Sequence, residues 1–129
     1  MAEQPKFEVI QGANAQYTAY LKDASGAAIT LANMVSLTLT LYDQSSLVQL
    51  NSRNAVDALN ANDVTVHATS GLLTWDIQPA DNTIYDSNLV AGRSEVHVAK
   101  FVLTYDTDKV AIKEFEISVI KLATSTTPA

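Results

Sequence analysis

The sequence contains no cysteine and few cations. The absence of cysteine excludes disulfide bonds, thiolate nucleophiles and thiolate metal ligands together, and it leaves the redox compartment undetermined. Eight Lys and Arg stand against 14 Asp and Glu, which gives a formal net charge of −6. The basic residues are scattered and no two are adjacent, whereas a nucleic-acid surface needs clustered cations. We therefore expect no nucleic-acid partner.

Long apolar runs are also absent. No run approaches the roughly 18–20 apolar residues that a membrane-spanning helix requires. The opening residues, MAEQPKFEV, lack the basic head and apolar core of a secretory signal. These observations predict no membrane partner and synthesis in a cytoplasm. The 129 residues fit one domain, which can bury about two thirds of its unfolded surface without a metal or a disulfide.

Recognisable catalytic motifs are missing as well. The chain has no GxSxG nucleophile elbow and no phosphate-binding loop. Glu114 and Glu116 alternate along one strand face and point the same way, so they do not converge as an acid–base pair. We predict that the protein is not an enzyme and uses no cofactor or small-molecule substrate.

The residues that could bind a metal have simpler interpretations. His67 and His97 are the only histidines, and the alternation places both on the outer face of strands. A zinc site needs at least one further protein ligand. Asp106 and Asp108 in YDTDK are too few for calcium, which takes six to eight oxygens, and they suit a hairpin turn. We therefore expect surface or interface histidines, a turn and no metal site.

What the sequence does contain is apolar residues at a period of two. Val35, Leu37, Leu39 and Leu41 alternate with Ser and Thr, which predicts a strand over Val35–Tyr42 with one buried face. A similar alternation precedes it and ends at Leu21. The connection KDASGAAITL contains the Asp and Gly of a type I turn closed by a residue at positive φ.

The second half of the chain repeats this pattern. The segment DVTVHATSGLLTWDI predicts a hairpin that turns at Thr69–Gly71 and places Trp75 in the core. Two long strands follow on either side of YDTDK. The first is apolar on both faces, which indicates a central strand or one covered by a partner. In the second, Val110 and Ile112 are out of phase with Phe115, which predicts a bulge near Lys113.

Two long connections rich in Asn and Asp interrupt the strands, at Asn51–Asp63 and Gln78–Ser94. We expect one helical turn at Ala55–Leu59 and another that starts at Pro79. Long ordered loops of compact domains often make contacts. The predicted partner-binding residues are Asn54, Asp57, Asn60, Asn82, Tyr85 and Arg93.

Seven or eight short strands separated by turns predict an all-β fold, an immunoglobulin-like antiparallel β-sandwich. We place this domain at residues 7–122. Residues 1–6 and 123–129 are small and polar, and they predict a flexible N-terminal arm and a flexible C-terminal tail.

The order of the turn and strand signals resembles that of a known family. The chain is similar to the small immunoglobulin-like domains of tailed-bacteriophage virions, such as the N-terminal domain of baseplate upper proteins and its neck, fibre and capsid-decoration relatives. The matching positions are Phe7, Gly12, Asp23, Gly26, Leu31, Gly71, Ile77, Pro79, Asp81 and Thr83. Ala13 stands where the family has an acidic residue, and Asn82 is an insertion.

The resemblance implies a non-enzymatic virion structural protein, made in the host cytoplasm and then carried on the particle. The role it favours is capsid decoration, in which many copies of a cement protein bind the major capsid protein. An alternative is a head–tail junction, neck, tail or baseplate component that anchors fibres. A second alternative, a carbohydrate-binding or adhesin module, would require exposed aromatic side chains on a flat face.

Overall fold

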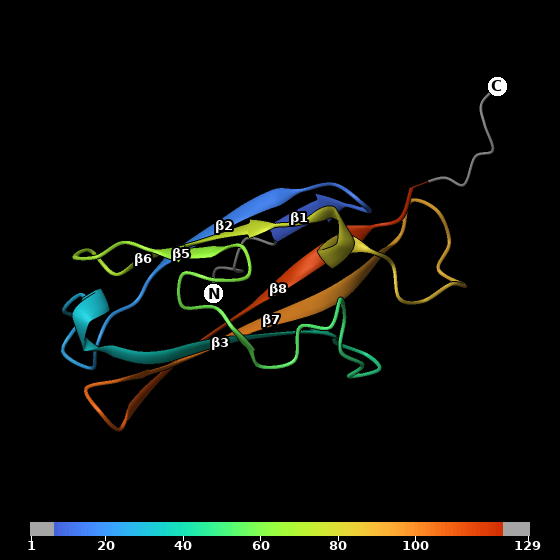
Figure 1. Cartoon of the computed structure of the whole chain (residues 1–129). Coiled ribbons are helices and arrows are strands. Elements are labelled where there is room, and N and C mark those ends of the chain that lie inside the picture. Colours follow the sequence, from blue (N-terminus) through green and yellow to red (C-terminus); the bar gives the residue numbers. More distant parts are fainter. Residues whose placement is uncertain (1–6, 123–129) are drawn as a thin grey trace, which may run out of the picture.

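The protein is an all-β sandwich of two stacked sheets, seen in a computed structural model that describes residues 7–122 (Figure 1). The predicted arm and tail, residues 1–6 and 123–129, lie outside the described residues. The strands are β1 Phe7–Ile10, β2 Ala15–Tyr20, β3 Met34–Asp43, β4 Val56–Asp57, β5 Val64–Val66, β6 Leu72–Ile77, β7 Ser94–Tyr105 and β8 Lys109–Ile120. Two 3-10 turns, η1 Leu31–Asn33 and η2 Pro79–Asn82, precede β3 and follow β6.

The strand order is that of an immunoglobulin-like domain. One sheet has the order β1-β8-β7-β3-β4 and the other the order β2-β6-β5. This matches the division of an immunoglobulin sandwich into its B, E and D strands on one side and its C, F and G strands on the other, with one extra edge strand beside C. All pairs are antiparallel except β1 with β8, in which Phe7 lies opposite Ile117. The predicted fold class and strand number are confirmed.

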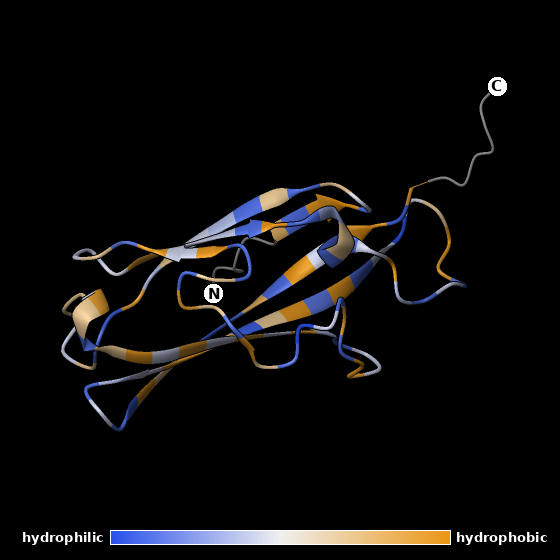
Figure 2. Cartoon of the chain, in the orientation of Figure 1, coloured by the Kyte–Doolittle hydropathy of each residue, from blue (hydrophilic) through white to orange (hydrophobic). Residues whose placement is uncertain are grey.

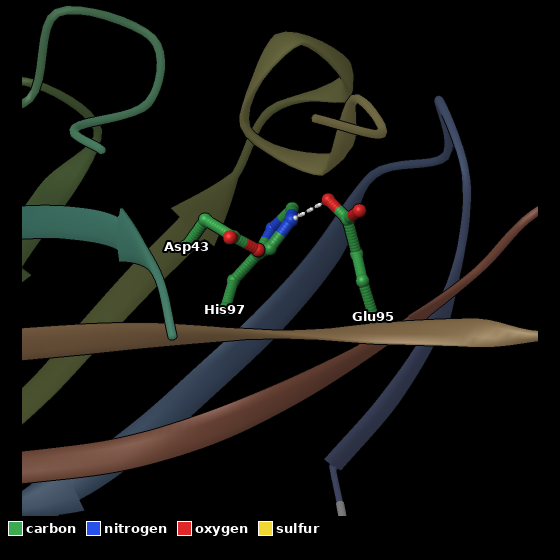
Figure 3. Close-up of side chains that lie close together, drawn as sticks. All are labelled: Asp43, Glu95 and His97. Carbon is green, nitrogen blue, oxygen red and sulfur yellow. Dashed lines mark hydrogen bonds and ion pairs between the residues drawn. The ribbon is translucent and has the colours of Figure 1, made fainter. Parts of the chain in front are cut away.

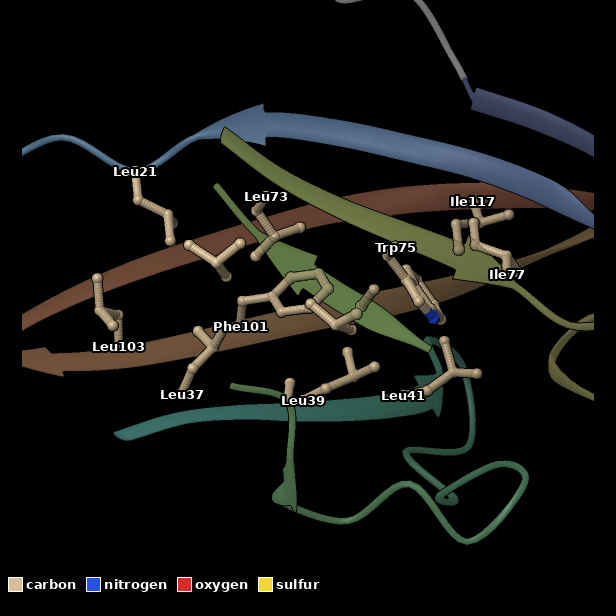
Figure 4. Close-up of a cluster of buried hydrophobic side chains, with 14 of the residues drawn as sticks. Leu21, Leu37, Leu39, Leu41, Leu73, Trp75, Ile77, Phe101, Leu103 and Ile117 are labelled. Atoms are coloured by element: carbon tan, nitrogen blue, oxygen red, sulfur yellow. The ribbon is translucent and has the colours of Figure 1, made fainter. Parts of the chain in front are cut away.

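The core lies between the two sheets, where the alternating apolar side chains of both sheets meet. Figure 2 shows apolar and polar residues alternating along the strands. Leu37, Leu39 and Leu41 of β3 are fully buried and face the β6 side of the core, as Figure 4 shows. Trp75 of β6 packs edge-to-face against Phe101 of β7, with ring centroids 5.7 Å apart. Burial of each such side chain contributes about 1.5–3 kcal/mol.

Strand β7 is central, as the apolar character of both its faces predicts. It pairs with β8 along one side and with β3 along the other. Its outward-facing Val98 is also buried, and it lies between the cross-strand partners Tyr42 and Glu116.

Two local predictions are wrong. No bulge occurs near Lys113, because the β7–β8 register runs unbroken from Ser94 opposite Ile120 to Tyr105 opposite Lys109. The irregularity lies instead in β3, between Met34 and Ser36, where it buries Met34 and exposes the flanking Val35.

The expected helical turn at Ala55–Leu59 is the short strand β4, which pairs with β3. The turn expected from Pro79 is present as η2. Two hydrogen bonds between Gln78 and Asp81 hold it: the Asp81 carboxylate accepts the Gln78 N–H at 2.8 Å, and the Gln78 backbone carbonyl accepts the Asp81 N–H at 2.9 Å.

Burial of Trp75 predicts its fluorescence. The chain has one tryptophan and its side chain is fully buried. We expect blue-shifted native emission that resists iodide quenching, and a red shift on unfolding in urea. Efficient iodide quenching of the folded protein would contradict this placement and would restore a surface on which Trp75 could stack against a sugar.

Candidate functional site

A buried ion-pair network fastens the two long connections to each other. The Arg53 guanidinium donates to both carboxylate oxygens of Asp81, at 2.5 and 3.0 Å, and to Asp63 at 3.0 Å. Asn51 also donates to Asp81, at 2.7 Å. Burial alone would lower the pKa of Arg53, but hydrogen bonds and charges from Asp81 and then Asp63 outweigh it and raise that pKa. A bidentate pair of this kind fixes both position and orientation.

The predicted partner-binding residues do not form one hydrogen-bonded group. Asn54, Asp57 and Arg93 are exposed, and Tyr85 is 46% exposed. Asp57 accepts the Leu59 backbone N–H.

The other two predicted residues also bond to the backbone. Asn60 is exposed, but its Oδ1 accepts the Val66 N–H at 2.7 Å, so this side chain shapes the turn into β5. Asn82 is fully buried, and its Nδ2 donates to the Ala13 carbonyl at 2.7 Å. The Asn82 side chain therefore holds the β1–β2 connection, and we remove it from the partner-binding set. Its neighbours in sequence are as polar as those of the exposed Asn residues, so no sequence signal separates it from them.

The outer face of the five-stranded sheet carries exposed apolar side chains. Its cross-strand rows are Ser36–Thr104–Val110, Thr38–Val102–Ile112 and Thr40–Lys100–Glu114. Val110 and Ile112 are 57% and 58% exposed. Leu47, in the β3–β4 connection, is 72% exposed and has a left-handed backbone with φ of 62°.

Leu47 also borders a hollow in this outer face. The hollow measures about 520 Å³ and is lined by Thr38, Thr40, Tyr42, Leu47, Ala55, Lys100 and Val102. Exposed leucine at positive φ is uncommon, because the Cβ of a non-glycine residue disfavours that conformation. No sequence pattern distinguishes Leu47 from the other apolar residues. The outer face and Leu47 together form one continuous candidate contact surface, which we call the outer-face surface.

A second group of polar residues lies where the C-terminal end of β3 pairs with the N-terminal part of β7. Asp43, Glu95 and His97 come together there, as Figure 3 shows, and we call them the acid–histidine cluster. Asp43 and His97 are direct register partners, and Glu95 precedes His97 by two residues on the same face. The expectation that His97 lies on an outer face is wrong: its side chain is fully buried, on the inward side shared with Ala99 and Phe101. His67 is exposed beyond the end of β5, in the other sheet, so the two histidines do not meet.

Neighbouring backbone groups orient both carboxylates of the cluster. Glu95 accepts the Tyr85 N–H at 2.6 Å and the Asp86 N–H at 3.0 Å, and its Oε2 lies 2.5 Å from His97 Nε2. Asp43 Oδ2 accepts the Ser46 N–H and hydroxyl at 2.9 and 2.8 Å. The buried His97 Nδ1 has no hydrogen-bond partner.

The cluster does not have the order of a nucleophilic triad. The Ser46 hydroxyl bonds to Asp43 and not to the imidazole, whereas a triad requires the histidine between the nucleophile and the acid. Within residues 7–122 it is the one group of three side chains with metal-ligating atoms close together. The sequence could not reveal it, because Asp43 meets His97 only through the pairing of β3 with β7.

No protein-family model matches the chain, and no curated protein matches it significantly. Over residues 7–122, no helix is long and apolar enough to cross a membrane.

Proposed function

We propose that the protein is a non-enzymatic structural component of a tailed-bacteriophage virion that binds another virion protein. The observation that carries the binding role is the outer-face surface, on which Val110, Ile112 and Leu47 are more than half exposed. Apolar side chains that gather on one face of a soluble domain mark a contact site more often than isolated ones do.

The residues on which the resemblance to phage virion domains rests have structural roles in this fold, which supports a shared immunoglobulin-like architecture. Asp23 accepts the Ser25 and Ala27 backbone N–H groups, which closes the turn that leads to Gly26. Gly71 sits in the β5–β6 turn at φ of +70°, and Asp81 caps η2 while it pairs with Arg53. Each of these residues has a structural role in the fold, so together they favour a shared architecture and not a particular docking surface.

The chemistry of the outer-face surface favours a partner with an apolar centre and basic surroundings. Glu114 and Glu116 follow Ile112 on the same face of β8, and Lys100 lies opposite Glu114. The chain as a whole carries a net charge of −6, so two copies would repel each other. We therefore assign the surface to a different virion protein and not to a second copy.

Capsid decoration is the placement we favour, with many copies bound to the major capsid protein according to the symmetry of the head. The alternative placement is the head–tail junction, neck, tail or baseplate. A carbohydrate-binding module is the second alternative, and the burial of Trp75 takes away the one tryptophan that could stack on a sugar ring.

Sedimentation tests both the placement and the surface. The purified protein is mixed with phage heads or with tails, and the pelleted copies per particle are measured. We expect binding to heads, and we expect Ile112→Asp to weaken it at least tenfold, because a charge at the centre of an apolar contact costs more than about 1.4 kcal/mol.

The matched control is Val90→Asp. Val90 is 67% exposed and lies in the 78–94 connection, away from the outer-face rows, so its change should leave binding unaltered. Native Trp75 emission verifies that each variant is folded. Binding to tails alone would move the protein to the alternative placement. Binding lost with Val90→Asp but retained with Ile112→Asp would transfer the contact to the loop that carries Tyr85 and Arg93. Binding to neither particle would overturn the proposed function.

A further inference from the structure

We propose that the acid–histidine cluster binds a divalent transition-metal cation, with Zn²⁺ as its probe. The site is separate from the outer-face surface, because Asp43, Glu95 and His97 face inward at the end of the sandwich. The proposal does not depend on the virion role.

The ligand types suit such an ion. Imidazole nitrogen binds Zn²⁺, Cu²⁺ and Ni²⁺ well, and carboxylate oxygen adds charge compensation. The ligating atoms of the three side chains lie within 4.8 Å of one another. Two ligands that are each about 2.0–2.2 Å from Zn²⁺ are at most about 4.4 Å apart, so small side-chain movements would complete the site.

The hydrogen bonds of the cluster leave two donor atoms for the ion. Glu95 engages His97 Nε2, which places the ring proton on that nitrogen and leaves a lone pair on Nδ1. Nδ1 is buried and unpartnered. Asp43 uses Oδ2 for Ser46, which leaves its Oδ1 available. We assign His97 Nδ1 and Asp43 Oδ1 as the two protein ligands and Glu95 as the carboxylate that orients the imidazole. This is one protein ligand fewer than a catalytic zinc site has, so the ion would be held more weakly than in such a site, with water in the other coordination positions.

An approach route for the ion is present beside Asp43. A hollow of about 510 Å³ opens there and is lined by Asp43, Ser45, Ser46, Tyr85, Asp86 and Ser87, so it reaches the cluster through Asp43 and not through His97 or Glu95. It can supply water molecules for the remaining coordination positions. The ion would also neutralise part of the negative charge that Asp43 and Glu95 bring to a partly buried place.

The test is calorimetric titration of the metal-free protein with Zn²⁺, and in parallel with Mn²⁺ and Ca²⁺. We expect one Zn²⁺ per chain and weaker binding of Mn²⁺ and Ca²⁺. Asp43→Asn should abolish specific binding. Glu95→Gln keeps an acceptor for His97 Nε2 and should weaken binding about 10–100-fold, which is the usual effect of changing an orienting carboxylate.

The matched control is His67→Gln, which removes the exposed histidine and should leave the affinity unchanged. Nitrogen NMR of the imidazole rings in the wild-type chain requires no substitution, so it remains decisive if a variant fails to fold. We expect the His97 Nδ1 resonance to shift on Zn²⁺ addition. An unchanged His97 resonance, no Zn²⁺ binding, or binding lost with His67→Gln would each overturn the site.

Discussion

Replacement of Asp81 by asparagine should lower the free energy of unfolding by about 3–5 kcal/mol, because it leaves the buried Arg53 charge without its main partner. Asp81 is itself buried and accepts hydrogen bonds from the Arg53 guanidinium, the Asn51 side chain and the Gln78 backbone N–H. The amide of asparagine keeps the volume of the side chain but loses its charge. Urea denaturation followed by Trp75 emission measures the effect, and the Arg53 guanidinium lies over that ring, 5.7 Å from its centroid.

The matched control is Asp63→Asn, which removes the other carboxylate bound to the same arginine. The Asp63 side chain is 40% exposed, so water can replace the lost contact and the expected cost is below about 1 kcal/mol. The double variant Arg53→Met with Asp81→Leu should recover part of the loss, since it removes the buried charge altogether. Equal losses for Asp81→Asn and Asp63→Asn would mean that burial does not determine the strength of these contacts.

Replacement of Gly71 by alanine is the second large effect, and it should destabilise the fold by about 2–5 kcal/mol. A Cβ at this position would lie 2.6 Å from the Leu21 carbonyl oxygen and 3.1 Å from that of Ile29, and neither backbone group can rotate away as a side chain can. The φ of +70° adds about 1–2 kcal/mol for any residue with a Cβ, and a forced contact in a packed region adds about 1–3 kcal/mol.

Gly26→Ala separates the two causes. Gly26 has φ of +88°, and a Cβ there would have no heavy atom within 4 Å. Its substitution should therefore cost about 1–2 kcal/mol, from backbone strain alone. The comparison uses the midpoints and slopes of urea unfolding curves. Losses of the same size at both glycines would contradict the close approach of the β5–β6 turn to the Leu21 and Ile29 backbone.

The sequence predicted the elements whose alternation is clean. The burial of the β3 leucines and of Trp75 follows from a period of two with polar residues between. The polar residues mark the solvent-exposed face of the strand, and the residues that alternate with them therefore face the core. β7 has no such polar face, so alternation could identify it as central but could not place His97 inside. Val110 and Ile112 led to the wrong prediction of a bulge near Lys113 for a related reason. Apolar residues on an exposed face look the same in sequence as apolar residues in a core.

The candidate sites depended on contacts between distant parts of the chain. Both long connections were predicted, but the burial of Arg53 is not visible locally because Asp81 lies 28 residues away in the chain. The acid–histidine cluster likewise requires the β3–β7 register. Exposed positions such as Asn54 and Arg93 were found because turn residues are polar wherever they occur, and this also explains why the buried Asn82 was grouped with them.

The parallel pairing of β1 with β8 has a consequence for mechanical load. The chain enters β1 at Phe7 and leaves β8 at Ile120, and these residues lie at opposite ends of the paired segment. Tension applied between the two points would therefore act along the strands, in shear, and load all the interstrand hydrogen bonds of the pair at once. An antiparallel terminal pair pulled from one end would open like a zipper, one bond after another. A domain held between two anchored neighbours would resist stretching through this short pair of strands.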